Sequence, residues 1–311
     1  GFVVDGKGLK MSKSLGNVIA PEDILKKYGA DILRIWVASS NYAEDLRIDY
    51  SILDQHSESY RKIRNTFRYV LGNLNDSFES INLEKINIQE LPELEQFMLH
   101  KIYQLDLNFK KYFKNYDFHN LYKDLLNFCT VDLSAFYFDI RKDCLYCDPK
   151  DSKKRKSTLL LLNIILNSLL KWFAPILSFT TEEIYQLVLK DKKSIHLEKF
   201  LNFPKNFENL ELNSKWSQLL KIRDVCNMSI EEKRGNKEIG SSLEASLIIK
   251  MNKENIKKIE GIDLSELCIT SSVEIIDIDS EEIKVITKKA AGDKCPVCWK
   301  ISEKPCKRHK N

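Results

Sequence analysis

Glycine is absent between residues 73 and 234. Because tight turns depend on glycine, its absence excludes a stretch rich in such turns and predicts a helical bundle. Long hydrophobic runs are missing as well. The one membrane candidate, residues 158–174, is shorter than a membrane span and is interrupted by Asn163, Asn167 and Lys171. We expect a buried bundle helix there, no membrane segment, and a cytoplasmic protein.

The sequence has no secretory signal and none of the common catalytic patterns. A Ser/His/Asp triad, a P-loop and a paired-carboxylate site are all missing. Without a secretory signal, the eight cysteines point to a reducing compartment, where they serve as thiols or metal ligands. Cys129, Cys226 and Cys268 lie on apolar stretches and are predicted core residues, and His119 and His196 are predicted to be structural.

Charge is plentiful, mixed and unevenly distributed. The 311 residues include 49 Lys and Arg against 45 Asp and Glu, a net charge of only +4. Residues 284–311, however, carry nine basic residues and two acids, so positive potential is concentrated there. The length allows two or three domains with buried cores.

The first two hundred residues show mostly helical patterns. A short strand at Val3 and Val4 enters an Asp-Gly turn, and a helix opens at Pro21. In residues 50–74 the apolar residues recur at three- and four-residue steps, which is typical of an amphipathic helix. Further helices are predicted at 30–38, 92–115, 117–141 and 157–174, and another begins at Thr180, where residues 180–183 form a capping-box pattern.

The pattern changes near residue 200. A linker at 202–206 and a helix at 214–235 precede β-like runs at 245–250, 267–270, 273–277 and 283–287, which predict a small α+β module. The last twenty residues contain too little apolar material to fold unaided. Between the predicted helices, residues 148–157 form a basic connection whose Lys153, Lys154, Arg155 and Lys156 are expected either to face phosphates or simply to be exposed.

Residues 10–14, Lys-Met-Ser-Lys-Ser, form a loop between the first strand and the first helix. We call this segment the lysine loop. Lys10 and Lys13 supply two point charges, and the hydroxyls of Ser12 and Ser14 and nearby glycine amides supply donors, a combination that suits a triphosphate.

The C-terminal cysteines have metal-ligand spacing. Cys295, Cys298, Cys306 and His309 form a C-x2-C-x7-C-x2-H pattern, in which the first pair can aim two thiolates at one ion. Three sulfurs and one imidazole suit a four-coordinate structural Zn²⁺. In so short a tail, metal binding would supply most of the folding free energy. Cys144 and Cys147 share the C-x2-C spacing but have no second pair nearby, so they are not expected to bind metal.

The lysine loop, continued by residues 15–17 and by the helical run 21–34, resembles the signature loop of class I aminoacyl-tRNA synthetases. The resemblance implies that Lys13 is the main ligand of ATP and of the transition state, where fixed cations meet charge developing on pyrophosphate, and that Lys10 supports it. Ser12, Ser14, Gly16 and Asn17 would shape the loop. None of the five histidines of this sequence lies in the family's His-x-Gly-His motif, and an inserted editing domain is missing. We therefore expect the C-terminal piece of a larger enzyme, inactive alone.

Four further runs resemble the bacterial type of isoleucyl-tRNA synthetase: residues 36–45, 59–73, 132–143 and 174–183. The resemblance implies a mainly α fold in four parts. These are the tail of a Rossmann-type catalytic domain (1–45), a stem-contact segment with a helical anticodon-binding bundle (46–201), a small α+β domain (202–290) and a zinc knuckle (291–311). His309 stands where this family usually has a cysteine, which leaves the identity of the fourth ligand open.

The same resemblance implies tRNA(Ile), ATP with Mg²⁺, and isoleucine as partners of a monomeric enzyme with one zinc. Arg61, Arg64 and Arg68 share one face of the predicted helix 50–74, where they either grip tRNA phosphates or form an ordinary solvated face. Trp299 either stacks on an anticodon-loop base or packs against the zinc site. The alternatives are a valyl-type or other class I synthetase and a non-catalytic tRNA-binding module.

Overall fold

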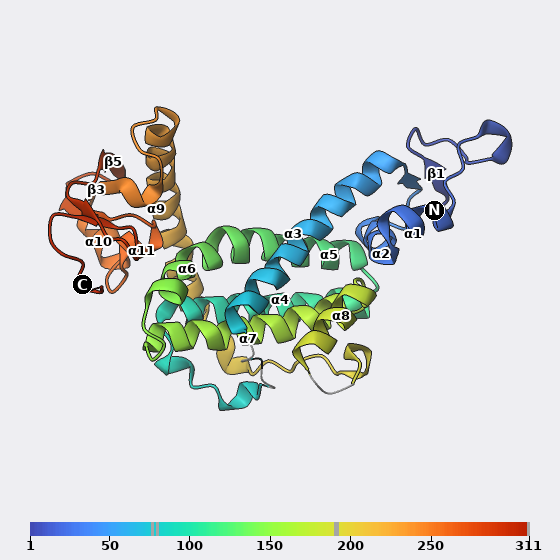
Figure 1. Ribbon diagram of the computed structural model, residues 1–311, viewed down its shortest axis with the longest axis horizontal. Helices are drawn as coiled ribbons and strands as arrows, with labels where there is room; N and C mark the ends of the chain where they lie inside the picture. The colour runs from blue at the N-terminus through green and yellow to red at the C-terminus, as the bar shows by residue number, and fades with distance from the viewer. Residues whose placement is uncertain (76–77, 79–80, 190–192, 310–311) are drawn as a thin grey trace. The chain divides into compact units, whose positions relative to one another are not determined.

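The computed structural model describes residues 1–75, 78, 81–189 and 193–309. These residues are mainly helical, as the sequence predicts, and they divide into two compact units (Figure 1). The first unit comprises residues 1–137 and 156–208, and the second comprises residues 138–155 and the chain from 209 onward.

The first unit begins with a small sheet and two short helices. Strand β1 (Val3–Asp5) pairs in parallel with β2 (Leu46–Ile48), so that Val4 lies opposite Arg47. Helix α1 (Pro21–Tyr28) has proline in its first turn, and Gly29, with φ of 84°, separates it from α2 (Ala30–Ser39). These elements hold the lysine loop at one end of the unit.

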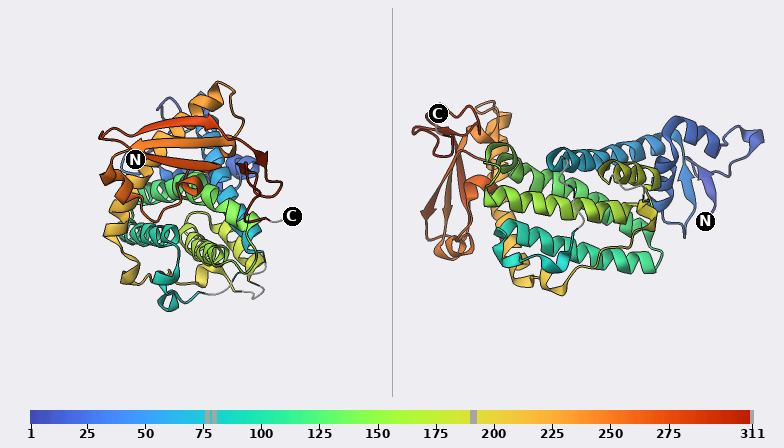
Figure 2. Two further views of the ribbon diagram at one scale, coloured as in Figure 1. Left: turned by 90° about the vertical axis from the view of Figure 1, so that its left-hand side faces the viewer. Right: turned by 60° about the horizontal axis from the view of Figure 1, so that its bottom comes forward.

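The rest of the first unit is a bundle of long helices. It contains α3 (Tyr50–Leu74), α4 (Glu93–Lys114), α5 (Phe118–Asn127) with a π-helical continuation (Phe128–Tyr137), most of α7 (Lys153–Phe173), and α8 (Ser178–Val188). Helices α4 and α7 run side by side (Figure 2), and Phe109 of α4 packs against Trp172 of α7. The helix predicted at 50–74 is confirmed, because its apolar stripe, including Ile63, Phe67 and Val70, is buried in this core.

The helix predicted to begin at Thr180 begins two residues earlier, at Ser178, and the capping-box prediction is wrong. A distant carboxylate caps the helix instead. Asp31 accepts hydrogen bonds from the backbone N–H groups of Phe179 and Thr180 at 3.2 and 2.8 Å and from the Thr180 hydroxyl at 2.6 Å. The cap therefore comes from 149 residues away in the chain, where local sequence gives no sign of it.

The second unit is an α+β module that also contains α6 (Phe138–Cys147). Helix α9 (Leu210–Gly235) contacts a three-stranded sheet in the order β4 (Ser272–Asp277), β3 (Ala245–Met251), β5 (Lys284–Lys289). Strand β3 is parallel to β4 and antiparallel to β5. Its alternate residues Ala245, Leu247, Ile249 and Met251 are buried, which explains the β-like pattern in the sequence.

Two short helices, α10 (Lys253–Lys258) and α11 (Leu264–Leu267), lie between β3 and β4. The strand predicted at 267–270 is wrong, because Leu267 ends α11 and Ile269 takes a left-handed φ of 55° that no strand accommodates. A hairpin of β6 (Asp293–Lys294) and β7 (Ile301–Ser302) follows the sheet.

Residues 158–174, the membrane candidate of the sequence, belong almost entirely to the buried helix α7, where Asn167 donates to the Asn163 carbonyl at 3.0 Å. In the described parts of the chain, we find no helix with both the length and the apolar character that a membrane crossing requires.

Candidate functional site

The lysine loop is held by the carboxylate of Asp5 at the end of β1. One oxygen of Asp5 accepts backbone N–H hydrogen bonds from Lys7 at 3.0 Å and Leu9 at 2.8 Å, which close the predicted Asp-Gly turn. The other oxygen accepts the side-chain amide of Asn17 at 2.9 Å. Hydrogen bonds from Asn17 and Leu9 lower the pKa of Asp5, so the carboxylate that organises the turn is charged at neutral pH.

Asn17 connects the two ends of the lysine loop. Its carbonyl oxygen accepts the backbone N–H of Ser12 at 2.9 Å, while its amide donates to Asp5 and, at 3.3 Å, to the Lys10 carbonyl. Within the loop, the Ser12 hydroxyl accepts the N–H of Leu15 at 3.3 Å and caps a single 3₁₀ turn (Lys13–Leu15), which ends at Gly16 with φ of 65°. The loop therefore has a defined backbone.

The ammonium groups of the lysine loop face solvent. Lys10 and Lys13 are both exposed, and neither forms an ion pair with any residue that the structure describes. Among the residues that the structure describes, no ion pair therefore neutralises the positive charge of the two lysines. Such an arrangement can bind an anionic ligand without first breaking an internal ion pair.

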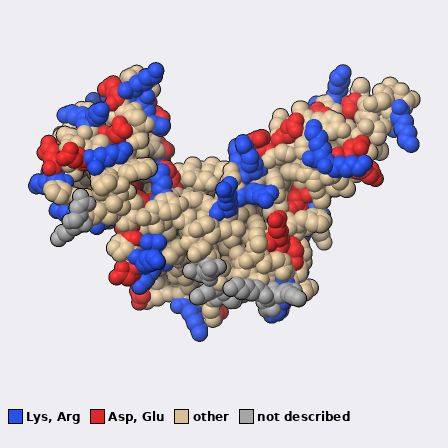
Figure 3. Space-filling view, in the orientation of Figure 1, with Lys and Arg blue, Asp and Glu red and all other residues tan. Residues whose placement is uncertain are grey.

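Basic side chains also gather on α3. Arg61, Arg64 and Arg68 are exposed along one face of the helix, and Figure 3 shows basic residues over its middle. Arg61 is paired with Glu58, whereas Arg64 and Arg68 form no ion pair within the described part of the chain.

The basic connection predicted at 148–157 is partly helical, because Lys153 to Lys156 form the first turn of α7. There Lys154 pairs with Glu266 at 2.9 Å, which argues against a freely exposed loop.

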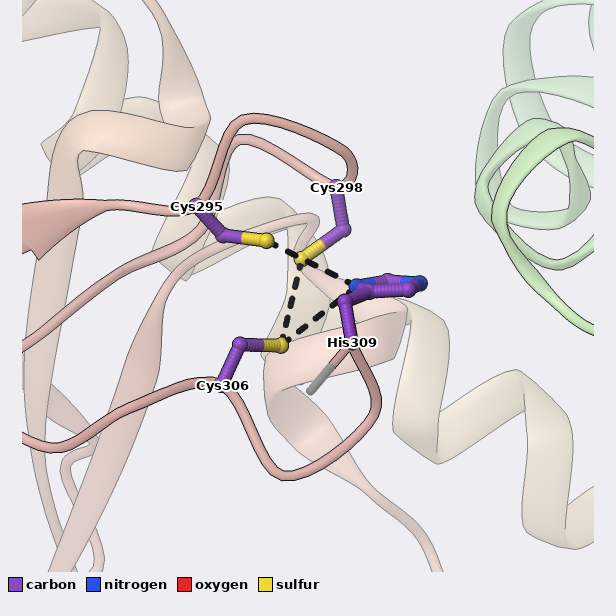
Figure 4. Close-up of side chains that lie close together, drawn as sticks. All are labelled: Cys295, Cys298, Cys306 and His309. Atoms are coloured by element: carbon purple, nitrogen blue, oxygen red, sulfur yellow. Dashed lines mark hydrogen bonds between the residues drawn. The ribbon is translucent and has the colours of Figure 1, made fainter. Parts of the chain in front are cut away.

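The four metal-ligand candidates come together beside the β6–β7 hairpin. Figure 4 shows the side chains of Cys295, Cys298, Cys306 and His309 pointing toward one another. Cys295 and Cys298 lie on the turn of the hairpin, which is closed by a 2.9 Å hydrogen bond from Cys295 N–H to the Lys300 carbonyl. All four ligand atoms lie within 4.8 Å of one another. This cluster could hold a metal ion.

The distances fit a tetrahedral ion. With metal–sulfur bonds of about 2.3 Å and metal–nitrogen bonds of about 2.0 Å, the edges of a tetrahedron come to about 3.8 Å between sulfurs and about 3.5 Å between sulfur and nitrogen. Cys298 Sγ lies 3.9 Å from Cys306 Sγ. His309 Nδ1 lies 3.4 Å from Cys306 Sγ and 3.6 Å from Cys295 Sγ. These three distances match the edges of such a tetrahedron, while the whole set spans up to 4.8 Å and would contract slightly around an ion.

The thiols of the pair on the hairpin differ in acidity. Backbone N–H groups of Cys298 and Val297 point at the Cys295 sulfur and lower its pKa to about 6, so it is a thiolate at neutral pH. Burial raises the pKa of Cys298 to about 11. Cys295 can therefore bind metal as the thiolate that it already is, whereas Cys298 must first lose a proton.

Trp299 follows the second cysteine directly and has a left-handed φ of 63°. The residue is 59% exposed, and the ammonium group of Lys294 lies 5.3 Å from the ring centroid. Together with Tyr146 of α6, it lines a cavity of about 1350 Å³ beside the hairpin. The exposed ring has a face available to a ligand, and the stacking role stays a prediction.

The remaining cysteines lie where the sequence places them. Cys129, Cys226 and Cys268 are buried in the cores of their units. Cys144 is buried and donates to the Arg141 carbonyl, and it is not among the described residues gathered as metal-ligand candidates. Cys147 is not a ligand candidate either, but its backbone carbonyl accepts from His309 Nε2 at 2.9 Å. Sequence reasoning missed this contact, which joins residues 162 positions apart.

Comparison with known proteins agrees with this arrangement. Residues 1–49 match the family described as tRNA synthetases class I (I, L, M and V), and residues 95–249 match the anticodon-binding domain of tRNA ligase. Isoleucine–tRNA ligase of Pelagibacter ubique is 70% identical over 99% of this chain and 34% of its own length. The corresponding protein of Agrobacterium fabrum is 40% identical over 97% of this chain and 32% of its own length.

A solved structure, the LeuRS–tRNA–LeuAMS ternary complex from Agrobacterium radiobacter K84, superposes with a TM-score of 0.52 at 18% identity, covering 67% of this chain and 24% of that one. At this identity the likeness concerns the fold alone. The chain spans about a third of the length of the curated relatives it matches. On the strength of the class I segment, the anticodon-binding domain and the isoleucine–tRNA ligase relatives, the chain belongs to the isoleucine–tRNA ligase family of class I aminoacyl-tRNA synthetases.

Proposed function

We propose that this chain supplies the lysine loop and the tRNA-binding domains of an enzyme that joins isoleucine to tRNA(Ile) through an isoleucyl-adenylate, using ATP with Mg²⁺. The observation that carries the proposal is the presence, in one chain, of a class I segment with two exposed lysines that pair with no described residue and of an anticodon-binding domain. The first is suited to the nucleotide, and the second to the RNA.

In the proposed reaction the isoleucine carboxylate attacks the α-phosphate of ATP, and pyrophosphate leaves. Lys13, with Lys10 beside it, meets the negative charge that grows on the leaving group. Because neither ammonium group has to break an ion pair with a described residue, its charge is available when the nucleotide binds. Asn17 and Asp5 keep the loop backbone in place without using the lysine side chains.

Charging by the complete enzyme tests this function. The coding frame upstream of Gly1 is read and expressed together with this chain, and charging of tRNA is measured with isoleucine and with valine. We expect a strong preference for isoleucine. A preference for valine would reject the proposed specificity, and an upstream frame without a His-x-Gly-His motif would favour a non-catalytic tRNA-binding module.

For the RNA, we propose that Arg64 and Arg68 on α3 bind tRNA phosphates, with Arg61 contributing less because it is paired with Glu58. Each phosphate contact adds about 0.7 to 0.9 to the slope of binding affinity against salt concentration on logarithmic scales. Arg64→Gln and Arg68→Gln should each lower that slope by about one contact. Lys62→Gln, on another face of the same helix, is the matched control, and an equal effect of Lys62→Gln would reject the role of this face.

For the Cys3His cluster, we propose that Cys295, Cys298, Cys306 and His309 hold one structural Zn²⁺. The donor set and its near-tetrahedral distances support zinc, and four protein ligands leave no open position for catalysis. When bound, the ion would fix the β6–β7 hairpin and the following loop as one body and so support Trp299, which we propose stacks on an anticodon-loop base.

A further inference from the structure

The C-terminal end of α6, with the turn that follows it (residues 148–152), lies against the metal-ligand cluster within the second unit. Three contacts join the two segments, although they are about 150 residues apart in sequence. His309 Nε2 donates to the Cys147 carbonyl at 2.9 Å, and the Cys147 thiol donates to the Val297 carbonyl at 3.6 Å. The third contact is made by Arg308, the residue beside the histidine ligand.

Arg308 is fixed by two carboxylates. Its guanidinium donates to Asp148 at 2.7 Å and to Asp143 at 2.6 Å, and the Asp148 side chain is only 13% exposed. Arg155 donates to the Asp148 backbone carbonyl at 2.8 Å and so holds the turn itself. A guanidinium shared between two carboxylates has a defined direction as well as charge, because its donors are arranged in a planar fork.

The two nitrogens of His309 therefore have different roles. Nδ1 faces the sulfurs of Cys295 and Cys306, and Nε2 faces α6. A hydrogen bond on the second nitrogen fixes the tautomer and orientation of a histidine ligand. A cysteine at this position could complete the ligand set, but it would have no second donor for the Cys147 carbonyl. The histidine thus connects the ligand set to α6.

We propose that the C-terminal end of α6 and the turn that follows it form the outer shell of the metal site, and that Arg308 is a positioning residue that orients His309 toward the ion. This inference rests on the zinc site proposed above. It implies that the metal stabilises the packing of the hairpin on α6 as well as the hairpin itself, because the fourth ligand bonds to both.

The test is zinc affinity of the full chain, measured by competition with a chromophoric chelator under reducing conditions. Loss of an outer-shell contact typically weakens metal binding by about 10- to 100-fold, and we expect a decrease in this range for Arg308→Met. Lys307→Met is the matched control, because Lys307 is the neighbouring exposed cation and pairs with no described residue. Its affinity should stay within about threefold of the wild-type value.

A second background separates positioning of His309 from general support of the hairpin. In His309→Ala the ligand is gone, so adding Arg308→Met should change the remaining affinity by less than about threefold. An equal loss in both backgrounds would overturn the positioning role. If Arg308→Met fails to fold, Asp143→Asn removes one of the two ion pairs of Arg308 while keeping the shape of the side chain, and it is expected to weaken zinc binding in the same direction, by a smaller factor.

The outcomes distinguish this inference from the proposed zinc site. Wild-type protein that binds no zinc would reject the site itself. If Arg308→Met and Asp143→Asn bind zinc as tightly as the wild-type protein does, the zinc site would stand but the outer-shell role would be overturned.

Discussion

The lysine loop and the Cys3His cluster both gather polar side chains, but only in the cluster do the functional atoms face one another. The sulfurs and the imidazole nitrogen lie within 4.8 Å, whereas the two ammonium groups are exposed and pair with no described residue. The backbone of the lysine loop is fixed by Asp5 and Asn17, which are only 12 positions apart in the chain. The cluster is held by contacts to α6 that span more than 140 residues.

This difference indicates what each site needs. The cluster is close to its bound geometry and contains a thiol that must lose a proton, so it is suited to an ion that stays in the protein. The lysine loop has fixed backbone and free charge, so it is suited to a ligand that arrives and leaves. Substitutions in the loop should therefore change the rate of adenylate formation. Substitutions in the cluster should change metal affinity and the thermal stability of the second unit.

The largest expected effect is on the rate of adenylate formation. Lys13→Ala in the complete enzyme should slow isoleucine-dependent ATP–pyrophosphate exchange by about 100- to 1,000-fold, because a charge that stabilises the transition state is lost. Its melting temperature and tRNA affinity should be unchanged. Lys7→Ala removes another exposed lysine of the same turn and should leave the exchange nearly unaffected. Equal loss of exchange and tRNA binding would contradict a catalytic role for Lys13.

A comparable loss, of metal affinity instead of rate, is expected in the cluster. Structural zinc sites bind with about 10 to 16 kcal/mol, so an equal share for one of four ligands corresponds to about 100- to 1,000-fold in affinity. Cys298→Ser should weaken zinc by about this factor and lower the melting temperature of the second unit. Cys129→Ser, which removes a buried thiol of the first unit that is not a ligand candidate, should keep its zinc. The same loss in both variants would show that the ligand set is misassigned.

Lowering the pH should weaken metal binding by the Cys3His cluster. In the proposed site zinc would bind the thiolate of Cys298, whose pKa burial raises to about 11, so the bound state would hold fewer protons and affinity should rise with pH. Between pH 8 and pH 6, zinc affinity should fall by at least about tenfold for each unit, because His309, whose pKa is raised by its hydrogen bond to the Cys147 carbonyl, must also lose a proton to bind metal. Cys295, with a pKa of about 6, adds little above pH 7. Chelator competition at several pH values measures this slope, and an affinity independent of pH would contradict the assignment of a protonated thiol.

The smallest effect is expected from the frame of the lysine loop. Asn17→Ala removes hydrogen bonds to Asp5, Ser12 and Lys10 but no charge. Since one such bond is worth about 0.5 to 1.5 kcal/mol, ATP–pyrophosphate exchange should fall by about 3- to 10-fold. The ratio of this loss to that of Lys13→Ala measures how much of the activity of the loop depends on its shape. A loss as large as that of Lys13→Ala would mean that shape and charge matter equally.

Features with a local cause were predictable from sequence. The helix at 50–74 follows from its apolar stripe, and the spacing of Cys295, Cys298, Cys306 and His309 was enough to identify the cluster that the structure assembles. The start of α8 was missed, because Asp31 caps it from a distant helix. Residues 267–270 look like a strand in sequence, but they are used to end α11 and turn toward β4.

The outer shell of the cluster could not be predicted at all. Asp143, Cys147 and Asp148 have no feature in sequence that distinguishes them from other residues at a helix end, and the Cys144–Cys147 spacing suggests only an isolated pair. Their role depends on a tertiary contact with Arg308 and His309. Similarly, the sequence predicts that Lys154 belongs to a basic loop, but in the structure it lies in α7 and pairs with Glu266.

The claim that gathered ligand atoms mark a resident metal, and dispersed charges a passing substrate, is tested most directly by the metal content of the purified full chain. Elemental analysis of protein kept under reducing conditions should find about one zinc per chain. Protein that retains no zinc while Cys295, Cys298 and Cys306 are intact and reduced would contradict the account.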